Sequence, residues 1–471
     1  METQSEDKDG TAAGLKKQLS PAHVWALAFG CIIGWGAFSL PAAVFLPKAG
    51  PLGTAIAFGV GILIMSVIAL NYHTMIVRYP KAGGEFTYAQ HYFGRRHAFI
   101  CAWFLGLSYL SIVPLNATGL SLVCRSFWGQ FFETGFHYRV AGYDVYLGEI
   151  LLAAAALIFF AWLSIRGVQL SGRFQTVLAI LLVGGVLIVA IAALLSPRAT
   201  LSNLLPAFSP NGTGGAGILA VVAVAPFCFV GFDTVPQSAE EFHFTPTKTR
   251  RIMIIAIIFG GLTYVILNTL TAAVLPEGYA SWSDYLQSLP QQTGLAQLPT
   301  FYAARLLLGQ AGLFFIGGAV LAAILSGIIG FYMAASRLLF SMAREQMLPA
   351  WFGQLHPRFH TPHHALLFIM TLSLLAPFFG RTVLGWIVDM SSLGAAIGYG
   401  YTSAAALRQA KKQGNRCIVL SGGIGVLLSL CFAAVLLVPL PGLSISLAKE
   451  PYVCLVVWSA AGILFYRIAQ K

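Results

Sequence analysis

Charged side chains are scarce in this chain of 471 residues: only 9% of them are charged. A soluble domain carries about 25% charged residues, because its surface must face water. So few charges cannot cover a water-exposed surface, which excludes an ordinary soluble protein. The hydrophobic share is 58%, and the mean hydropathy is +0.78. The chain is therefore expected to be solvated mostly by lipid.

Other absences exclude further classes of protein. Residues 1–19 are polar and lack the short apolar core of a cleavable signal peptide, so they are expected to form a cytoplasmic tail. The seven cysteines are scattered without a Cys-x-x-Cys pair, and the histidines within 356–364 have no Cys or carboxylate beside them, so no metal site is predicted. No Walker loop and no spaced nucleophile–base pair occurs. We therefore expect neither ATP-driven transport nor an enzyme, and no cofactor.

Long apolar runs are what the chain has instead. A membrane-spanning helix needs roughly 20 consecutive apolar residues. Lipid cannot satisfy free backbone groups, so such runs must be helical, and the short alternating strands of a barrel are not seen. The sequence predicts an all-α membrane protein with twelve transmembrane helices. The predicted spans cover residues 21–47, 52–78, 98–124, 148–165, 174–195, 216–240, 252–275, 311–341, 364–380, 383–407, 418–440 and 451–468.

The net charge of +12 could suggest a nucleic-acid partner, but the distribution of the basic residues argues against one. With a cytoplasmic N-terminus and twelve alternating spans, most of the 28 lysines and arginines fall on the inner side. This is the positive-inside asymmetry of a membrane protein. It predicts a plasma or inner membrane protein with both termini in the cytoplasm. The outer side holds only Lys48, Arg125, Arg139, Arg198, Arg305, Arg381 and Lys449.

Two of the predicted spans are interrupted in the middle. The first reads FGCIIGWGAFSLP over residues 29–41, and the sixth reads VAPFCFVGFDTVP over residues 224–236. Glycine and proline lower the cost of leaving the helix, and an unwound segment in a membrane is tolerated only against protein or a wet cavity. Broken spans at matching places in two halves indicate the central site of a transporter. The alternative is that both segments are glycine-rich packing faces.

Each interrupted span is the first of five, which suggests a repeated unit. The two units cover about 20–195 and 215–408, and helices 11 and 12 follow within 417–471. Because five is odd, the second unit enters the membrane from the opposite side, so the repeat is inverted. Half-helix N-termini offer free N–H groups to a carboxylate, and half-helix C-termini offer carbonyls to an ammonium. A zwitterion fits such a site without any charged side chain.

Several segments in order resemble the amino acid–polyamine–organocation (APC) transporters, which have the leucine-transporter-type fold. Residues 34–38 resemble the family's break in the first helix, and residues 231–241 resemble the sixth helix of its cationic-amino-acid-transporter-like branch. The remaining segments with a likeness to the family are PKAGGEFTY at 80–88, RGVQLSGRFQ at 166–175, and 336–349 with Thr361-Pro362.

The resemblance implies roles for the residues at the breaks. The amides of Gly34, Trp35 and Gly36 would hold the substrate carboxylate. The carbonyls of Ile32, Phe227 and Val230 would hold its amino group, and Cys228 would line the side-chain pocket. Phe227 and Phe331 fall where relatives place aromatic gates. For Phe227, Cys228 and Phe331 the alternative is an ordinary place in the helix packing.

Two departures from the family pattern bear on the substrate and the mechanism. Trp35 stands where most relatives have a small residue, so its indole would either shrink the pocket or point outward. Residues 174–195 contain no lysine, which argues against the lysine-switched mechanism of some proton-coupled members.

Ionisable residues near the breaks are the remaining candidates, because charge in a span is costly and usually functional. Asp233 could load and release a proton, or it could cap the outgoing half of the sixth helix. Glu240 and Glu241 are expected to contact a nearby arginine or lysine. Glu85 and Tyr88 are expected to belong to the cytoplasmic gate.

Together these features predict a secondary transporter of a small amino acid that works by alternating access, with proton coupling and exchange as the candidate modes. The partners are then the bilayer and a small solute, not nucleic acid. A carrier of a polyamine or other amine is the first alternative. An integral membrane enzyme or a channel is more distant.

Overall fold

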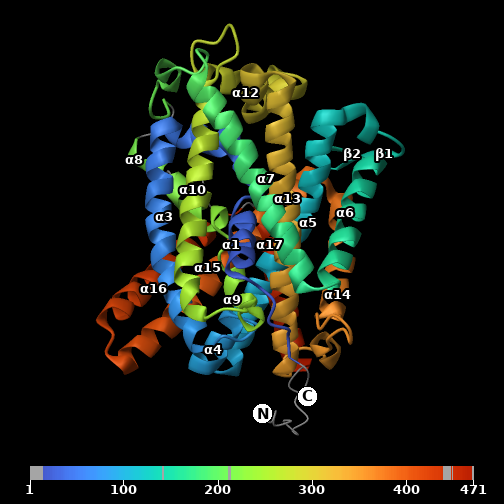
Figure 1. The fold of residues 1–471 in the computed structure, drawn as a ribbon, viewed down its shortest axis with the longest axis vertical. Helices are drawn as coiled ribbons and strands as arrows, with labels where there is room; N and C mark the ends of the chain where they lie inside the picture. The colour runs from blue at the N-terminus through green and yellow to red at the C-terminus, as the bar shows by residue number, and fades with distance from the viewer. Residues whose placement is uncertain (1–13, 141–142, 211–213, 439–446, 448, 469–471) are drawn as a thin grey trace, which may run out of the picture.

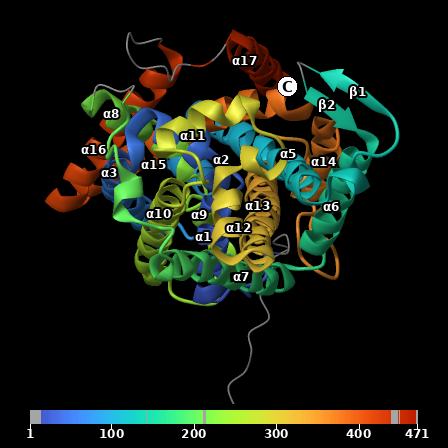
Figure 2. The same ribbon diagram turned by 90° about the horizontal axis from the view of Figure 1, so that it is seen from above.

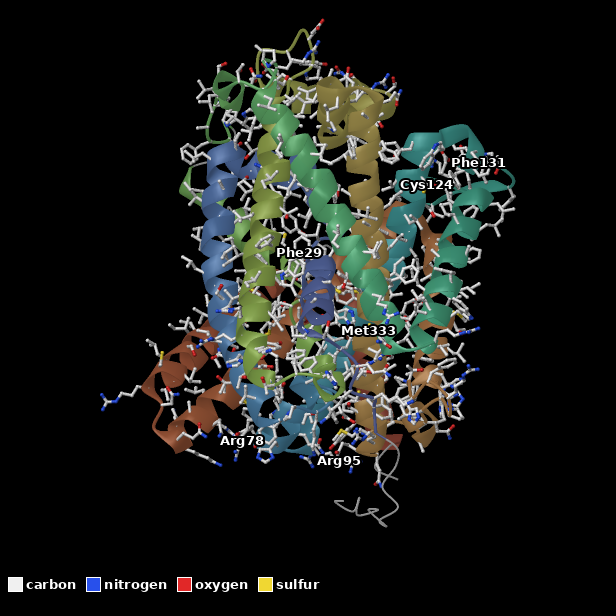
Figure 3. The ribbon with its side chains drawn as sticks, viewed as in Figure 1. Phe29, Arg78, Arg95, Cys124, Phe131 and Met333 are labelled. Atoms are coloured by element: carbon white, nitrogen blue, oxygen red, sulfur yellow. The ribbon has the colours of Figure 1, made fainter. Side chains whose placement is uncertain are left out.

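The computed structural model describes residues 14–468, apart from 141–142, 211–213, 439–446 and 448. Long helices run side by side along the longest axis of the molecule (Figure 1). A small antiparallel hairpin of β1 (His137–Val140) and β2 (Tyr143–Tyr146) lies at one edge. Arg78 and Arg95 lie at the same end of the bundle (Figure 3), here called the Arg95 end. The opposite end, which carries the helix α12, is called the α12 end.

The first half of the chain contains α1 (Pro21–Ile32), α2 (Gly36–Leu40), α3 (Leu46–Arg78), α4 (Glu85–Phe93), α5 (Arg95–Phe132), α6 (Leu147–Ile165) and α7 (Val168–Leu195). The second half contains α8 (Gly215–Cys228), α9 (Thr234–Gln237), α10 (Thr249–Ala273), α11 (Trp282–Ser288), α12 (Pro299–Leu308), α13 (Gln310–Arg344), α14 (His363–Ser373), α15 (Gly380–Gln413), α16 (Arg416–Leu437) and α17 (Lys449–Ile468). A π turn covers Pro41–Phe45, and 3-10 turns cover Leu201–Leu204, Ala239–Glu241, Pro246–Lys248, Leu289–Gln291, Gly294–Gln297, Ala350–Gly353 and Ala376–Phe379.

The prediction of a helical membrane protein is confirmed. Among the described residues, seven helices are long and apolar enough to cross a membrane, and three shorter apolar helices accompany them. Each of the twelve predicted spans is helical over most of its described residues. The number of twelve crossings stays a prediction. The seven long spans are 36–78, 95–129, 147–165, 168–195, 246–273, 310–344 and 416–437.

The first and sixth predicted spans are interrupted, as their glycines and prolines indicate. Helix α1 ends at Ile32, because Ile33 takes an extended conformation (φ −97°, ψ 96°), and α2 resumes at Gly36. Helix α8 ends at Cys228, and α9 begins only at Thr234. Thus α1–α2 and α8–α9 are each two half-helices separated by a few residues of non-helical backbone.

The interrupted helices lie inside the bundle. Helix α1 packs against α7, α10 and α13, and α8 packs against α3 and α15. Seen from above, α1 and α9 lie among the longer helices (Figure 2). Nearly every residue of α13 from Ile316 to Ala343 is buried. The core of the molecule therefore surrounds the two breaks on several sides.

Candidate functional site

The two breaks touch each other. Gly231 has φ +141°, a backbone conformation that only glycine adopts readily. A Cβ at this position would lie 2.5 Å from the amide nitrogen of Ile32 and 2.6 Å from the carbonyl carbon of Cys31. Glycine is thus required twice at position 231, for the conformation and for the close approach. The opened backbones of α1–α2 and α8–α9 lie in direct contact.

A small cavity of about 50 Å³ lies beside this contact. One buried water needs about 10–15 Å³, so the cavity has room for a few water molecules. Six of the seven residues predicted to bind substrate line it, and so does Phe331. The lining residues are Cys31, Ile32, Gly34, Trp35, Gly36, Ile112, Leu115, Asn116, Phe227, Val230, Tyr264 and Phe331. The seventh, Cys228, is buried within hydrogen-bonding reach of Tyr264 and is not among them.

Two polar lining residues were missed by the sequence reasoning. The Tyr264 hydroxyl donates a hydrogen bond to the Ile32 carbonyl at 3.3 Å. The Asn116 side-chain amide donates to the Ile112 carbonyl at 3.0 Å, one turn earlier on α5. Asn116 also faces the first break, because a Cβ on Gly34 would lie 3.5 Å from its Oδ1. A polar amide within an apolar span is costly in lipid, and this cost was the available signal for Asn116.

Trp35 lies between the cavity and α12. Its indole stacks on Phe301 of α12 with ring centroids 6.1 Å apart. Its Cβ would be 3.5 Å from a Cβ placed on Gly119 of α5. Phe301 in turn contacts Phe38 and Phe127 at 6.2 and 5.5 Å. The large residue between the two glycines is thus accommodated by an aromatic cluster on the α12 side of the cavity.

The Asp233 side chain is fully buried and bonds to the second break. Its Oδ1 accepts a hydrogen bond from the Gly231 amide at 2.7 Å, and its Oδ2 accepts one from the Tyr109 hydroxyl at 3.0 Å. The side chain makes no capping bond to α9, so the predicted cap of the outgoing half-helix is not seen in this described segment. The Tyr109 ring lies 5.9 Å from that of Phe331. Asp233 therefore connects the unwound backbone to α5 just behind the cavity.

Glu85 and Tyr88 lie outside the cavity lining, between the cavity and the Arg95 end. The Glu85 carboxylate is buried at the start of α4, where it accepts hydrogen bonds from Tyr72 (2.8 Å) and from Gln237 just after the second break (2.6 Å). Burial, followed by the nearby Asp233 carboxylate, raises the pKa of Glu85 to about 8. The Tyr88 hydroxyl is buried and has no hydrogen-bond partner among the described residues.

Two ion pairs join the segment after α9 to α13 at the Arg95 end, which confirms the predicted contacts of Glu240 and Glu241. The Arg337 guanidinium donates to both oxygens of Glu241, at 2.9 and 3.1 Å, and both side chains are at most 1% exposed. The Arg344–Glu240 pair, at 3.0 Å, is more exposed.

The chain before α1 crosses the same segment. The amides of Gln18 and Leu19 both donate to the Glu241 carbonyl at 2.9 Å, and His243 donates back to Leu19. The Ala82 amide donates to the Glu240 carboxylate at 3.2 Å. Four segments thus meet and close the Arg95 end of the bundle. They are the N-terminal segment, the loop before α4, the segment after α9, and α13, and this meeting point is here called the closure. A polar hollow of about 430 Å³ opens beside it, lined in part by Lys81, Gln90 and Arg344.

The sequence is similar to those of known transport proteins. A family model described as "Amino acid permease" matches residues 19–461. The branched-chain amino acid permease BcaP of Bacillus subtilis is 28% identical, over 83% of this chain and 79% of its own length. The methylthioribose transporter of the same organism is 26% identical, over 81% and 79%. The low-affinity putrescine importer PlaP of Escherichia coli is 22% identical, over 90% and 86%.

Proposed function

The chain belongs to the amino acid permease family, and on this premise we propose that it carries a small amino acid across a membrane by alternating access. The observation that carries the proposal is the contact between the two helix breaks, with a cavity beside it. Broken helices that meet inside the bundle offer backbone donors and acceptors to a solute. Family membership argues against the membrane enzyme and the channel.

The backbone beside the cavity suits a zwitterion. The first N–H groups of a helix lack intrahelical partners, so the amides of Gly34, Trp35 and Gly36, which line the cavity, would serve as donors for a carboxylate. The carbonyls of Ile32 and Phe227 each accept one hydrogen bond already, from Tyr264 and Val230. A carbonyl oxygen has two lone pairs, which leaves one on each for a substrate ammonium.

The finer architecture is part of the proposal. Twelve crossings in a leucine-transporter-type fold would comprise an inverted pair of five-helix units, 20–195 and 215–408, followed by helices 11 and 12 within 417–471. Support comes from the position of the breaks, since α1–α2 and α8–α9 each open one of these units. Residues 14–19 would then be cytoplasmic, as would the Arg95 end.

Substrate would reach the cavity from one side at a time, through the opening of either the Arg95 end or the α12 end. A volume near 50 Å³ is too small for an amino acid, so the breaks must move apart for substrate to enter. Phe227 and Phe331 would gate the cavity itself, and Glu85 and Tyr88 would belong to the closure on the cytoplasmic side. Asp233 is the candidate for proton coupling, because its carboxylate holds the second break.

An amine without a carboxylate is the second candidate substrate. The similarity to a putrescine importer favours it. A diamine would need two acceptor sites and would leave the donors around Gly34 unpaired. The described cavity lining contains no acidic side chain to compensate a second ammonium. This difference favours the amino acid.

Uptake into proteoliposomes tests the proposal. Purified protein is reconstituted and offered labelled neutral, branched-chain and cationic amino acids, with putrescine as the amine. Saturable uptake of one amino acid, competed by its unlabelled form, is the expected result. Flux that rises linearly with concentration, or saturable uptake of putrescine alone, would reject the amino acid carrier. Protein-free liposomes are the control.

A further inference from the structure

A groove between α5 and α17 has features that the transport cycle does not use. It has a volume of about 380 Å³ and an almost entirely apolar wall. Phe99 and Trp103 of α5 line it from one side, and Tyr466 of α17 lines it from the other. Helix α17 lies at the rim of the bundle (Figure 2), so the groove faces the surrounding lipid in a membrane.

The wall of the groove is firmly built. The indoles of Trp103 and Trp458 stack at 4.7 Å, and each N–H donates to the other residue's backbone carbonyl, at 2.9 and 3.2 Å. The Phe99 ring lies 5.0 Å from Tyr466. A Cβ on Gly462 would lie 2.6 Å from the Trp103 indole nitrogen. The absence of a side chain at Gly462 therefore lets α17 approach α5 while the groove beside it stays open.

Two arginines line the end of this groove that lies at the Arg95 end. Arg96 belongs to the first turn of α5 and Arg467 to the last turn of α17. Neither guanidinium has an ion-pair partner among the described residues. Arg95, by contrast, donates to the Gln346 carbonyl at 2.7 Å. The positive end of the α5 dipole adds to the attraction for an anion at this place.

A second apolar hollow, of about 370 Å³, lies on the other face of α17 and provides a comparison. It shares Trp103 with the groove, but no charged residue lines it. An apolar chain could lie in either place. Of the two, only the groove joins an apolar wall to two cations for which the described residues supply no ion-pair partner.

We propose that this groove binds one anionic phospholipid of the adjoining leaflet. Arg96 and Arg467 hold its phosphate, and an acyl chain lies against the aromatic wall. From Arg96 to Phe104 the groove follows α5 for roughly 12 Å, at 1.5 Å per residue. That length matches a headgroup and the upper part of one chain. Anionic lipids of the cytoplasmic leaflet are attracted to such basic sites between spanning helices.

Native mass spectrometry of the full-length protein in detergent tests the proposal. The probes are phosphatidylglycerol and phosphatidylcholine with identical acyl chains. The wild-type protein is expected to retain one phosphatidylglycerol in preference to phosphatidylcholine. The double variant R96Q/R467Q is expected to bind phosphatidylglycerol about 25-fold more weakly, about fivefold for each arginine, with phosphatidylcholine unchanged. Both arginines are exposed, so the variant is expected to fold.

Matched variants separate the two parts of the site. K411Q/K412Q removes two exposed cations at the end of α15 that do not line the groove, and is expected to leave lipid binding unchanged. Ser459→Phe fills the groove without a change of charge and is expected to displace both lipids. Glycerol 3-phosphate, which lacks acyl chains, is not expected to compete at millimolar concentration.

Four results would overturn the proposal. They are equal retention of the two lipids by the wild type, retention of phosphatidylglycerol by R96Q/R467Q, an equal loss in K411Q/K412Q, and no loss in Ser459→Phe. Competition by glycerol 3-phosphate would assign the arginines to a free phosphate ester instead. All these outcomes are independent of which solute the protein transports.

Discussion

Replacing Glu241 by glutamine leaves the Arg337 guanidinium buried without its carboxylate. Loss of one partner from a buried ion pair costs about 3–5 kcal/mol in the conformation that contains the pair. In the proposed cycle, opening of the cytoplasmic end separates the segment after α9 from α13, so water solvates both groups and the cost disappears. The substitution should therefore shift the equilibrium toward the cytoplasm-open state by about 3 kcal/mol, on the order of 100-fold.

The native thiol of Cys31 reports this shift, because it is 5% exposed and lines the central cavity. Exposed Cys417 and Cys431, and partly exposed Cys454, are first replaced by serine. A membrane-impermeant maleimide is then applied from the cytoplasmic side of sealed vesicles. Labelling that is absent in Cys31→Ala is assigned to Cys31. We expect Glu241→Gln to label on the order of 100-fold faster than the parent protein.

Two controls isolate the charge effect. R337M/E241M replaces the pair by apolar side chains, which is often neutral or stabilising in a buried site, so slow labelling should return. Glu240→Gln breaks a pair whose arginine is 44% exposed, which is worth about 0–1 kcal/mol, and should change the rate less than about fivefold. A folded Glu241→Gln protein that labels at the parent rate would show that this pair does not hold the end closed.

Three further predictions concern the breaks and the buried acids. Gly231→Ala should abolish substrate binding in a ligand thermal-shift assay, because the new Cβ meets Ile32, whereas Gly184→Ala, with open space around it, should bind normally. The stability of the wild type against thermal unfolding should fall as pH rises from about 4.5 to about 8, because the folded state favours the neutral form of Glu85; a Glu85→Gln profile with the same slope would refute this. Asp233→Asn should remove the pH dependence of uptake, and an unchanged profile would exclude a proton role for Asp233.

The breaks could be predicted from sequence because their causes are local. Gly34, Gly231 and the neighbouring prolines change backbone preferences at their own positions, whatever packs around them. A contact between the two breaks could be expected only from the predicted repeat. The structure shows the physical reason for the contact: Gly231 has no side chain, so the backbone of Ile32 can approach it closely.

Side-chain partners across the bundle could not be predicted in the same way. Asn116 and Tyr264 line the cavity because α5 and α10 pack beside it. No local sequence pattern specifies which helices pack beside the cavity. An ionic contact for Glu241 was expected, but its partner Arg337 is 96 residues away in sequence. The direction of the Trp35 indole could not be predicted either, because it depends on the stacking contact with Phe301 of α12. Packing between distant segments determines each of these.

The segment from Gly231 to Glu241 connects the cavity to the closure at the Arg95 end. It is bonded to the surrounding helices at three successive levels: Asp233 to Tyr109 of α5, Gln237 to Glu85 of α4, and Glu241 to Arg337 of α13. These bonds occupy only eleven residues, most of them buried. A solute that moves the second break must therefore displace Asp233, whose carboxylate accepts from the Gly231 amide. Because the same short segment carries the Glu241–Arg337 pair, binding and opening are expected to be coupled through it, without a separate relay.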